Sequence, residues 1–490
     1  MLLVLAVTTM QIAGLPSATQ DIVQSFVVIA VPALAGGRAV RRSRVTPRAS
    51  AQPQLPLISN SILFKERHSV NEPTRIEADY LVETAYDPRK AIEAMAGEQS
   101  SGTFIAVPGE TPELKARSAA RIEALELLET VDAPSLPGAS RPKGQPDALV
   151  RRARATLSWP IENMGPSLPN LLATIAGNLF ELKQVSGLRL LDVRLPHAFA
   201  EAYDGPKFGI AGTRRLAGVE GRPLIGTIIK PSVGFGPQET ADVVATLCEA
   251  GIDFIKDDEL QGDGPHCPFD ERARAVMAVI NRHAERSGRK VMFAFNLTGE
   301  LDEMRRRHDL VRDLGGTCVM ASLNSVGLVG IRELARHSEL PIHAHRNGWG
   351  YLSRHPLLGW SYVAWQKIWR LAGVDHMHVN GLRNKFFEDD ESVVASARAC
   401  LTPMFADKPC TVMPVFSSGQ TAVQVADTFA ALGSTDLIHT AGGGILAHPD
   451  GPAAGVAGLR EAWEAAMAGI PAAEYAKGHP ALARALEAYA

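Results

Sequence analysis

Short apolar runs recur at a regular spacing in the second part of this 490-residue chain, from residue 223 onward. Helical patterns lie between most of them, for example at 239–251 and 269–288. Eight such units over about 250 residues match the size of a closed parallel (β/α)8 barrel, the TIM barrel. A doubly wound sheet would also suit the alternation, but eight units favour closure. The runs are 224–229, 252–255, 291–295, 317–321, 340–344, 374–379, 411–416 and 436–439.

A different alternation precedes the barrel pattern. Residues 75–86 and 148–161 have strand-like patterns. Residues 113–129 have the spacing of an amphipathic helix, and 167–182 have a proline near a helix start followed by helical apolar spacing. These elements predict an N-terminal α+β domain of the ferredoxin-like type.

The expected domain organisation follows from these two patterns. We place the α+β domain at 58–200 and the barrel, with additional C-terminal helices, at 201–490. Residues 1–57 are poor in structure signals and are expected to be a disordered extension or the product of an over-long start.

Composition excludes some classes of partner. The net charge is −3 and 46% of residues are hydrophobic, so nothing global indicates nucleic acid or a membrane surface. The apolar stretch at 1–10 is too short to span a bilayer. The five cysteines lack CxxC spacing, which is typical of reduced thiols, and we expect a cytoplasmic protein.

Chemistry in a TIM barrel is found at the C-terminal ends of the strands. The second apolar run is followed there by Lys256, Asp257, Asp258 and Glu259. Successive strand side chains alternate between faces, so Lys256 and Asp258 share one face, and Glu259 joins them as the strand ends. Two carboxylates with a third oxygen donor suit Mg²⁺. A lysine could ligate the metal only if deprotonated or converted to a carbamate, and the carbamate is an anionic oxygen donor. The alternative is a surface charge cluster.

Other strand ends carry residues suited to a phosphorylated substrate. Glycine-containing segments at 417–420 and 442–444 follow runs seven and eight, where TIM barrels bind phosphate through backbone N–H groups. Arg346 could bind a phosphate with two hydrogen bonds. We expect His345 and His378 to face the barrel mouth, and His343 and His376 to face the barrel wall. The aromatic-rich segment 361–373 is expected to be core.

The motifs IIKP, FIKDDE, HAHR and DHMH together resemble the large chain of ribulose bisphosphate carboxylase/oxygenase (RuBisCO). The similarity is greater to the RuBisCO-like proteins that do not fix CO₂, and it covers about residues 75–485. The resemblance implies that a carbamate on Lys256, Asp258 and Glu259 hold Mg²⁺, and that Lys230, Lys256, His345 and Lys385 are catalytic. It implies substrate or phosphate contacts from Arg346, His378, Ser417, Gly419, Gly442 and Gly443. It also implies a homodimer or higher homo-oligomer in which the partner subunit contributes Glu98, Thr103 and Asn170.

Several positions depart from the carboxylase pattern. Ser232 stands where the carboxylase has a second active-site lysine, Phe104 replaces its tryptophan, and Ile228 replaces its strand-one threonine. The segment 379–388 also differs strongly. These departures predict that one phosphate site is kept and the second altered, and that the protein does not carboxylate ribulose bisphosphate.

The expected reaction proceeds through an enediolate of a phosphorylated keto-sugar acid. By resemblance, the first expectation is decarboxylation or carbon–carbon hydrolysis of 3-oxo-isoapionate 4-phosphate. The alternatives are isomerisation of 5-methylthioribulose 1-phosphate and enolisation of a diketo-methylthiopentyl phosphate. A non-catalytic sugar-phosphate-binding or structural relative is the alternative from another class. Nothing in spacing or composition separates these substrates.

Overall fold

The structure is a computed structural model that describes residues 74–102 and 107–490. The predictions for the extension at 1–57, for the start of the first domain at 58 and for Thr103 and Phe104 lie outside the described residues. Among the described residues, no helix is both long and apolar enough to cross a membrane.

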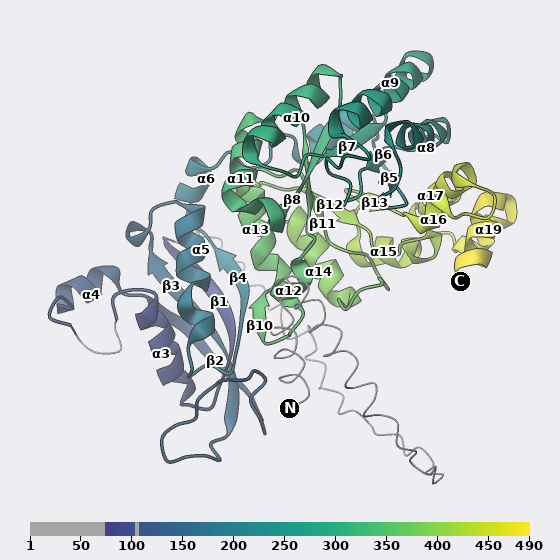
Figure 1. The fold of residues 1–490 in the computed structure, drawn as a ribbon. Helices are drawn as coiled ribbons and strands as arrows, with labels where there is room; N and C mark the ends of the chain where they lie inside the picture. Colours follow the sequence, from purple (N-terminus) through teal and green to yellow (C-terminus); the bar gives the residue numbers. More distant parts are fainter. Residues whose placement is uncertain (1–73, 103–106) are drawn as a thin grey trace, which may run out of the picture. The chain divides into compact units, whose positions relative to one another are not determined.

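The first described part is a five-stranded sheet (Figure 1) with strand order β10-β4-β1-β3-β2. Its strands are β1 (Arg75–Thr84), β2 (Arg121–Val131), β3 (Val150–Pro160), β4 (Gly187–Arg194) and β10 (Leu358–Trp360). Strand β1 pairs antiparallel with β3 and β4, and β3 pairs antiparallel with β2. With α3 (Pro88–Glu98) after β1 and α5 (Leu168–Ala176) after β3, this is the ferredoxin-like arrangement, as predicted.

Strand β1 shows why this sheet has a buried face. Ile76, Ala78, Tyr80 and Val82 alternate along it and are fully buried, which is the pattern of a strand with one face on the core. Helix α3 then begins after Asp87, whose side chain accepts a hydrogen bond from the Lys90 backbone N–H.

The predicted helix at 113–129 is wrong in its second half. Helix α4 (Pro112–Ser118) is short, and β2 begins at Arg121. Ile122 and Leu125 pair with Leu157 and Ala155 of β3. Helical spacing in an isolated segment is a weak signal, and here the neighbouring strand decides the conformation.

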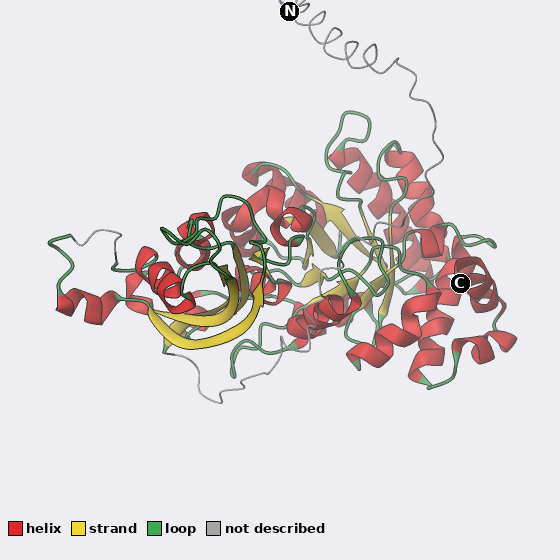
Figure 2. Cartoon of the chain, turned by 90° about the horizontal axis from the view of Figure 1, so that it is seen from below, coloured by secondary structure: helices red, strands yellow, loops and turns green. Residues whose placement is uncertain are grey.

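The second part is a closed barrel of eight parallel strands in the order β11-β12-β13-β5-β6-β7-β8-β9. Each predicted apolar run overlaps one of these strands, so the TIM barrel is confirmed. Helices surround the strands, which are yellow in Figure 2. The strands are β5 (Leu224–Ile228), β6 (Phe254–Lys256), β7 (Met292–Asn296), β8 (Cys318–Ser322), β9 (Ile342–His345), β11 (His376–His378), β12 (Met413–Phe416) and β13 (Ile438–Thr440).

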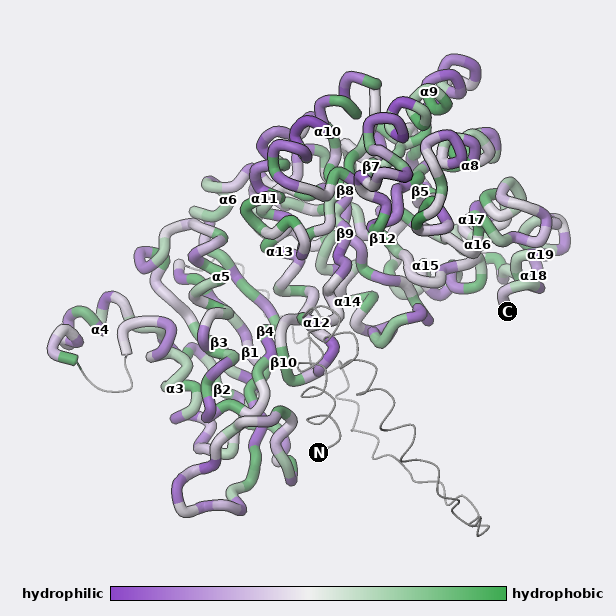
Figure 3. Tube along the Cα trace, in the orientation of Figure 1, coloured by the Kyte–Doolittle hydropathy of each residue, from purple (hydrophilic) through white to green (hydrophobic). Residues whose placement is uncertain are grey.

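The helices around the barrel are amphipathic, and hydrophilic residues gather along the outer α9 and α10 (Figure 3). The longer ones are α8 (Pro237–Glu249), α9 (Phe269–Ser287), α10 (Leu301–Asp313), α11 (Leu323–His337), α13 (Tyr362–Ala372), α14 (Asp390–Leu401), α15 (Val425–Leu432), α17 (Pro452–Met467) and α19 (Pro480–Tyr489). The others are α6 (Ala198–Ala202), α7 (Gly209–Ala217), α12 (Trp349–Ser353), α16 (Gly443–Leu446) and α18 (Ala472–Tyr475). Short 3-10 turns lie at Ile161–Asn163, Asn178–Glu181, Ala422–Gln424 and Ala476–Gly478.

Helix α13 is core, as its sequence predicted. Tyr362, Trp365 and Trp369 are buried along one face, and the Trp365 ring lies 4.9 Å from the ring of Trp349. Large aromatic surfaces at helical spacing therefore stabilise the fold here, and no stacking platform for a ligand is needed to explain them.

Strand β10 connects the two sheets in an unexpected way. It follows β9 in the chain, yet it pairs parallel with β4, with Leu358 opposite Leu188 and Trp360 opposite Leu190. The Arg189 guanidinium strengthens this join by donating to the carbonyl of Ser353 at 3.0 Å. A segment of the barrel region thus forms the edge of the first sheet.

Candidate active site

Four charged side chains meet where β5 and β6 end. Strand pairing sets Ile228 opposite Lys256, so the residues that follow these two strands are neighbours. Lys230 Nζ lies 2.5 Å from Asp258 Oδ2. Lys256 Nζ lies 3.9 Å from Glu259 Oε2 and donates to the Asp257 carbonyl at 2.7 Å. The structure therefore brings together Lys230, Lys256, Asp258 and Glu259, as the sequence predicted.

Burial makes the two lysines different. The Lys256 side chain is 1% exposed and that of Lys230 is 43% exposed. Burial lowers the pKa of Lys256, although the nearby Glu259 carboxylate opposes that change. Burial is the largest single influence on Asp258 and would raise its pKa, but the hydrogen bonds from Lys230 and the Leu260 N–H, together with the charges of the two lysines, lower the pKa overall. Lys256 therefore loses its proton more readily than an ordinary lysine, and it does so beside an ionised carboxylate.

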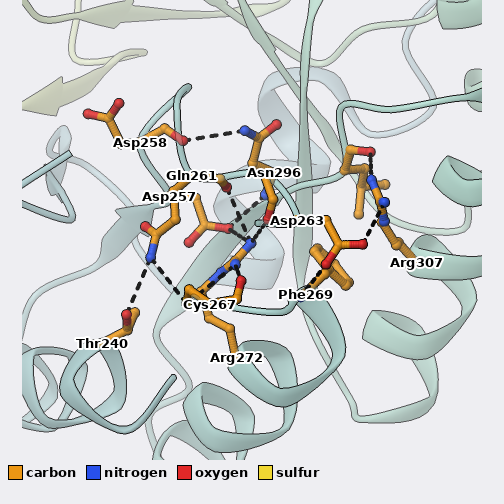
Figure 4. A network of polar contacts seen from close by, with 12 residues as sticks. Thr240, Asp257, Asp258, Gln261, Asp263, Cys267, Phe269, Arg272, Asn296 and Arg307 are labelled. Carbon is orange, nitrogen blue, oxygen red and sulfur yellow. Dashed lines mark hydrogen bonds and ion pairs between the residues drawn. The ribbon is translucent and has the colours of Figure 1, made fainter. Parts of the chain in front are cut away.

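The Asp257 carboxylate contacts Arg272 and the Asn296 backbone, and it holds the loop after β6 in place (Figure 4). Its Oδ2 accepts from the Asn296 backbone N–H at 2.9 Å and from Arg272 Nη2 at 3.2 Å. Arg272 is fully buried and also donates to the carbonyls of Gly262 and Cys267. Burial raises the pKa of Asp257, and the Arg272 charge opposes it. The buried ion pair of Arg272 and Asp257 therefore fixes the position of the loop after β6.

A second arginine, Arg307, connects the loop after β7 with the loop after β6. Arg307 donates to the carbonyl of Thr298 at 3.2 Å and to Asp263 Oδ2 at 2.9 Å. The Phe269 ring lies 5.3 Å from the Arg272 guanidinium and 5.6 Å from that of Arg307. Sequence reasoning did not single out either arginine. Each lies in a helical pattern, where nothing distinguishes it from a surface residue.

Residues after β7 and β9 complete this side of the mouth. The Asn296 amide donates to the Glu259 carbonyl at 3.2 Å, which fixes the backbone of the acidic motif. His345 Nε2 lies 3.4 Å from Glu259 Oε2. Burial lowers the pKa of His345 to about 3, and the Lys256 charge acts in the same direction. His345 is thus a neutral imidazole next to the predicted metal ligands.

The expectation that His343 and His376 face the barrel wall is wrong. His343 Nε2 lies 2.7 Å from His378 Nε2, and His343 Nδ1 lies 3.4 Å from His376 Nδ1. The rings of His345 and His378 are 4.6 Å apart. Residues two apart in a strand point to the same face, so all four histidines fill the barrel interior.

Arg346 has a partner that the sequence analysis did not identify. Its Nη2 donates to Glu388 Oε2 at 2.5 Å, and both side chains are at least nine-tenths buried, at 7% and 6% exposure. Among the described residues, Arg346 Nη1 is buried without a hydrogen-bond partner. Glu388 is one of four consecutive acids at 388–391. No sequence signal distinguishes it from Asp389, which caps the N-terminus of α14.

The loops after β11, β12 and β13 lie against one another. The Lys385 backbone N–H donates to the Ser418 carbonyl at 3.2 Å. Gly419 has φ +86°, and a Cβ at Gly444 would lie 2.6 Å from the Gln420 carbonyl oxygen, so glycine is required at both positions. At Gly443 a Cβ would meet nothing within 4 Å. Ser417, in contrast, is buried, and its Oγ is 3.1 Å from His378 Nδ1.

The residues expected from the partner subunit have local contacts. Glu98 ends α3 and accepts from the Asn178 amide at 3.5 Å, and the Asn170 amide in α5 donates to the Met164 carbonyl at 3.2 Å. Both are exposed. Within the described ranges, neither side chain hydrogen-bonds to the barrel.

The fold agrees with the comparisons to known proteins. The family model for the ribulose bisphosphate carboxylase large chain, catalytic domain, matches residues 209–489, and the model for its N-terminal domain matches residues 145–199. The chain belongs to the ribulose bisphosphate carboxylase large-chain family. Within that family it is a RuBisCO-like protein.

Individual relatives are similar over nearly their whole length. The chain is 62% identical to a 3-oxo-isoapionate-4-phosphate transcarboxylase/hydrolase of Xanthobacter autotrophicus, over 84% of this chain and 98% of that protein. It is 45% identical to a 3-oxo-isoapionate-4-phosphate decarboxylase of Rhizobium etli, with the same coverage. The crystal structure of a rubisco-like protein from Burkholderia fungorum has a TM-score of 0.80 and 52% identity, covering 85% of this chain and 100% of that one.

Solved carboxylases with lower identity form assemblies. A dimeric enzyme from Hyperthermus butylicus is 31% identical with a TM-score of 0.72, over 85% of this chain and 97% of that one. An octameric enzyme from Pyrococcus horikoshii is 30% identical with a TM-score of 0.74, over 85% of this chain and 94% of that one.

Proposed function

We propose that the protein is a 3-oxo-isoapionate-4-phosphate transcarboxylase/hydrolase that acts through an enediolate. The 62% identity to an enzyme of that name supports the substrate. The observation that carries the chemistry is the contact between Lys230 and Asp258 beside the buried Lys256. Decarboxylation of the same substrate is the second candidate, favoured by the 45% identical relative.

The predicted metal site fits Mg²⁺ on the chemistry of its donors. Asp258 and Glu259 offer hard carboxylate oxygens. Lys256 is buried beside Glu259, and burial lowers its pKa. It therefore forms more readily the neutral amine that must attack CO₂ to give a carbamate. In this proposal the carbamate on Lys256, Asp258 and Glu259 hold the ion. When bound, Mg²⁺ would act as a Lewis acid that stabilises negative charge on the substrate oxygens.

The chain's own residues account for the proton transfers. Lys230 is exposed to the barrel mouth at the end of a hydrogen bond to Asp258, where it can stabilise a developing enediolate and return a proton to it. His345 is neutral, so it can accept a proton or a hydrogen bond from a substrate hydroxyl. Lys385 lies in the loop after β11, from which we expect it to reach the reacting carbon.

A 3-oxo acid suits this arrangement because its ketone lies β to the carboxylate. Loss of the carboxyl group as CO₂ leaves the electron pair on the carbon between them, conjugated with the ketone. A decarboxylase protonates that carbon and releases CO₂. In a transcarboxylase/hydrolase the carboxyl group is added back at the other enediolate carbon, and water then cleaves a carbon–carbon bond. The second route consumes one water, yields two acids and releases no net CO₂.

We also propose a homo-oligomeric functional unit. The dimeric and octameric assemblies of solved relatives support this. Glu98, Thr103 and Asn170 would then enter the barrel mouth of the partner subunit, as the family resemblance implies. The exposure of Glu98 and Asn170 agrees with that role.

The deciding experiment follows one substrate by NMR. Purified protein with Mg²⁺ and bicarbonate is incubated with 3-oxo-isoapionate 4-phosphate labelled with ¹³C in its carboxyl group. If the phosphorus and carbon spectra show one phosphorylated acid and one acid without phosphate, and no ¹³CO₂ appears, the result supports the transcarboxylase/hydrolase. Stoichiometric ¹³CO₂ with one keto-sugar phosphate supports the decarboxylase. Unchanged substrate refutes both, and parallel incubations with 5-methylthioribulose 1-phosphate and a diketo-methylthiopentyl phosphate then test the alternatives. Lys256→Ala is the control for contaminating activity.

A further inference from the structure

The Arg346 side of the mouth is neutralised by the protein itself. Arg346 and Glu388 form a buried ion pair at 2.5 Å. A guanidinium that is to bind a phosphate dianion needs its positive charge uncompensated, or the two anions repel each other in a region of low dielectric constant. The family resemblance implies a phosphate contact at Arg346, but the Glu388 carboxylate already neutralises the charge of that guanidinium.

Glu388 is fixed in place by donors from three elements. Besides Arg346, the Asn380 amide at the end of β11 donates to its Oε2 at 2.7 Å. The Ser392 hydroxyl in α14 donates to its Oε1 at 2.9 Å. A carboxylate with three hydrogen bonds and 6% exposure is part of the packed structure. Displacing it from Arg346 would leave the Glu388 carboxylate buried without its charge partner, which is unfavourable.

The chain of buried histidines that leads to His378 adds no charge. The Thr213 hydroxyl donates to the Gly209 carbonyl at 2.5 Å, so it must accept from His376 Nε2 at 2.8 Å. His376 Nδ1 is then an acceptor, and His343 Nδ1 donates to it. Each ring supplies one proton to the next, which is the pattern of neutral imidazoles. Burial lowers the pKa of His376 to about 3 and that of His343 well below its ordinary value.

The same chain of contacts determines what Ser417 can donate. Because His343 Nε2 is an acceptor, His378 Nε2 carries the proton of the 2.7 Å contact between them. His378 Nδ1 is left as an acceptor, and the Ser417 hydroxyl at 3.1 Å supplies its hydrogen. The reverse assignment would set two lone pairs against each other at His343 and His376. Ser417 therefore offers a ligand an oxygen lone pair and no proton.

We propose that the subsite formed by Arg346, His378 and Ser417 binds an uncharged oxygen group of the substrate, and that Glu388 excludes a second phosphate from it. Arg346 Nη1, buried and without a partner among the described residues, is the donor for that group, and Ser417 Oγ accepts from a substrate hydroxyl. The single phosphate then binds on the side of Gly419, Gly442 and Gly443. This inference rests on the proposed function, whose substrate carries one phosphate.

The experiment compares two ligands that cannot react. One is a four-carbon polyol monophosphate, and the other is a five-carbon polyol with a phosphate at each end. Isothermal titration of the full-length protein with Mg²⁺ and bicarbonate gives the ratio of their dissociation constants. In the wild type we expect the two affinities to agree within about threefold, because the second phosphate finds no charge to bind. In Glu388→Gln, which frees the Arg346 charge, we expect the bisphosphate to gain at least about tenfold.

Three controls make the result specific. Glu391→Gln removes the same charge from an exposed neighbour and should leave the ratio unchanged. The double variant Glu388→Gln with Arg346→Met should lose the gain. The wild-type ratio needs no variant to fold, so it tests the proposal by itself. A wild-type preference of tenfold or more for the bisphosphate, no measurable binding of the monophosphate, or a gain that persists without Arg346 would each overturn the proposal. Because no turnover is measured, these outcomes are independent of the NMR test of the reaction.

Discussion

The two sides of the barrel mouth treat charge differently. At the ends of β5 and β6, Lys230 is 43% exposed and Glu259 is 32% exposed, and their charges face the mouth. At the ends of β9 and β11, Arg346 and Glu388 compensate each other in the interior, beside four neutral histidines. The charges of the first side, here called the open side, can interact with a metal ion and with a developing enediolate. On the second side, here called the closed side, the charges are already paired and buried. A family motif that contains Arg346 therefore need not bind a phosphate in this protein.

The largest effect is expected on the open side. Lys256→Ala removes the amine and should lower Mg²⁺-dependent turnover by about 1,000-fold or more, as loss of a metal ligand in an electrostatic catalyst does. Steady-state assays with the proposed substrate measure this. Lys290→Ala, at a lysine just before the N-terminal end of β7 and so away from the C-terminal strand ends, is the matched control. Turnover equal to wild type in Lys256→Ala would contradict the carbamate role.

The brace behind the open side should matter for stability. Arg272→Met leaves Asp257 buried without its charge partner, so we expect the free energy of unfolding to fall by about 3–5 kcal/mol. Arg306→Met removes the exposed pair with Asp270 and should cost less than about 1 kcal/mol. Urea denaturation followed by circular dichroism compares them. Equal losses in the two variants would show that the buried pair is not special.

The neutral histidines should make the closed side sensitive to acid. Burial lowers the pKa of His376 from its ordinary 6.5 to about 3, so below pH 6.5 the unfolded chain binds a proton that the native state refuses. Stability is therefore lost as pH falls, by about 2 kcal/mol between pH 7 and pH 5 for this group. In His376→Gln the pH-dependent loss should shrink by that amount. His266→Gln, at an exposed position, is the control, and identical profiles for all three proteins would refute the neutral chain.

The smallest effect tests whether the open side is shared between subunits. An Asn170→Ala chain and a Lys230→Ala chain, each inactive alone, are refolded together. If Asn170 enters the partner's site, a heterodimer has one intact site, and random pairing gives about a quarter of wild-type activity. Heterodimers isolated through two affinity tags provide the measurement. Isolated heterodimers without activity would count against a shared site.

The eight barrel strands could be predicted because each is a short apolar run bounded by polar loops, and the residues after each run then had a known place. Lys230, Asp258 and His345 are close together for that reason. The errors arose where a partner far away in the chain decides the outcome. Residues 121–131 form a strand because β3 lies beside them. Glu388 is paired because the loops after β9 and β11 meet, and Arg272 because its helix packs behind β6. None of these contacts has a local signature.

Strand β10 has a practical consequence for anyone who wishes to produce the two halves separately. A gene cut near residue 200 would give a barrel fragment whose Leu358–Trp360 segment has lost β4, its one sheet neighbour among the described residues. The complementary fragment would expose β4 as a bare edge, which invites aggregation. We therefore expect each fragment to express poorly alone and both to be rescued by co-expression. The two domains are therefore expected to depend on each other for folding, because three residues from the barrel region complete the sheet of the first domain.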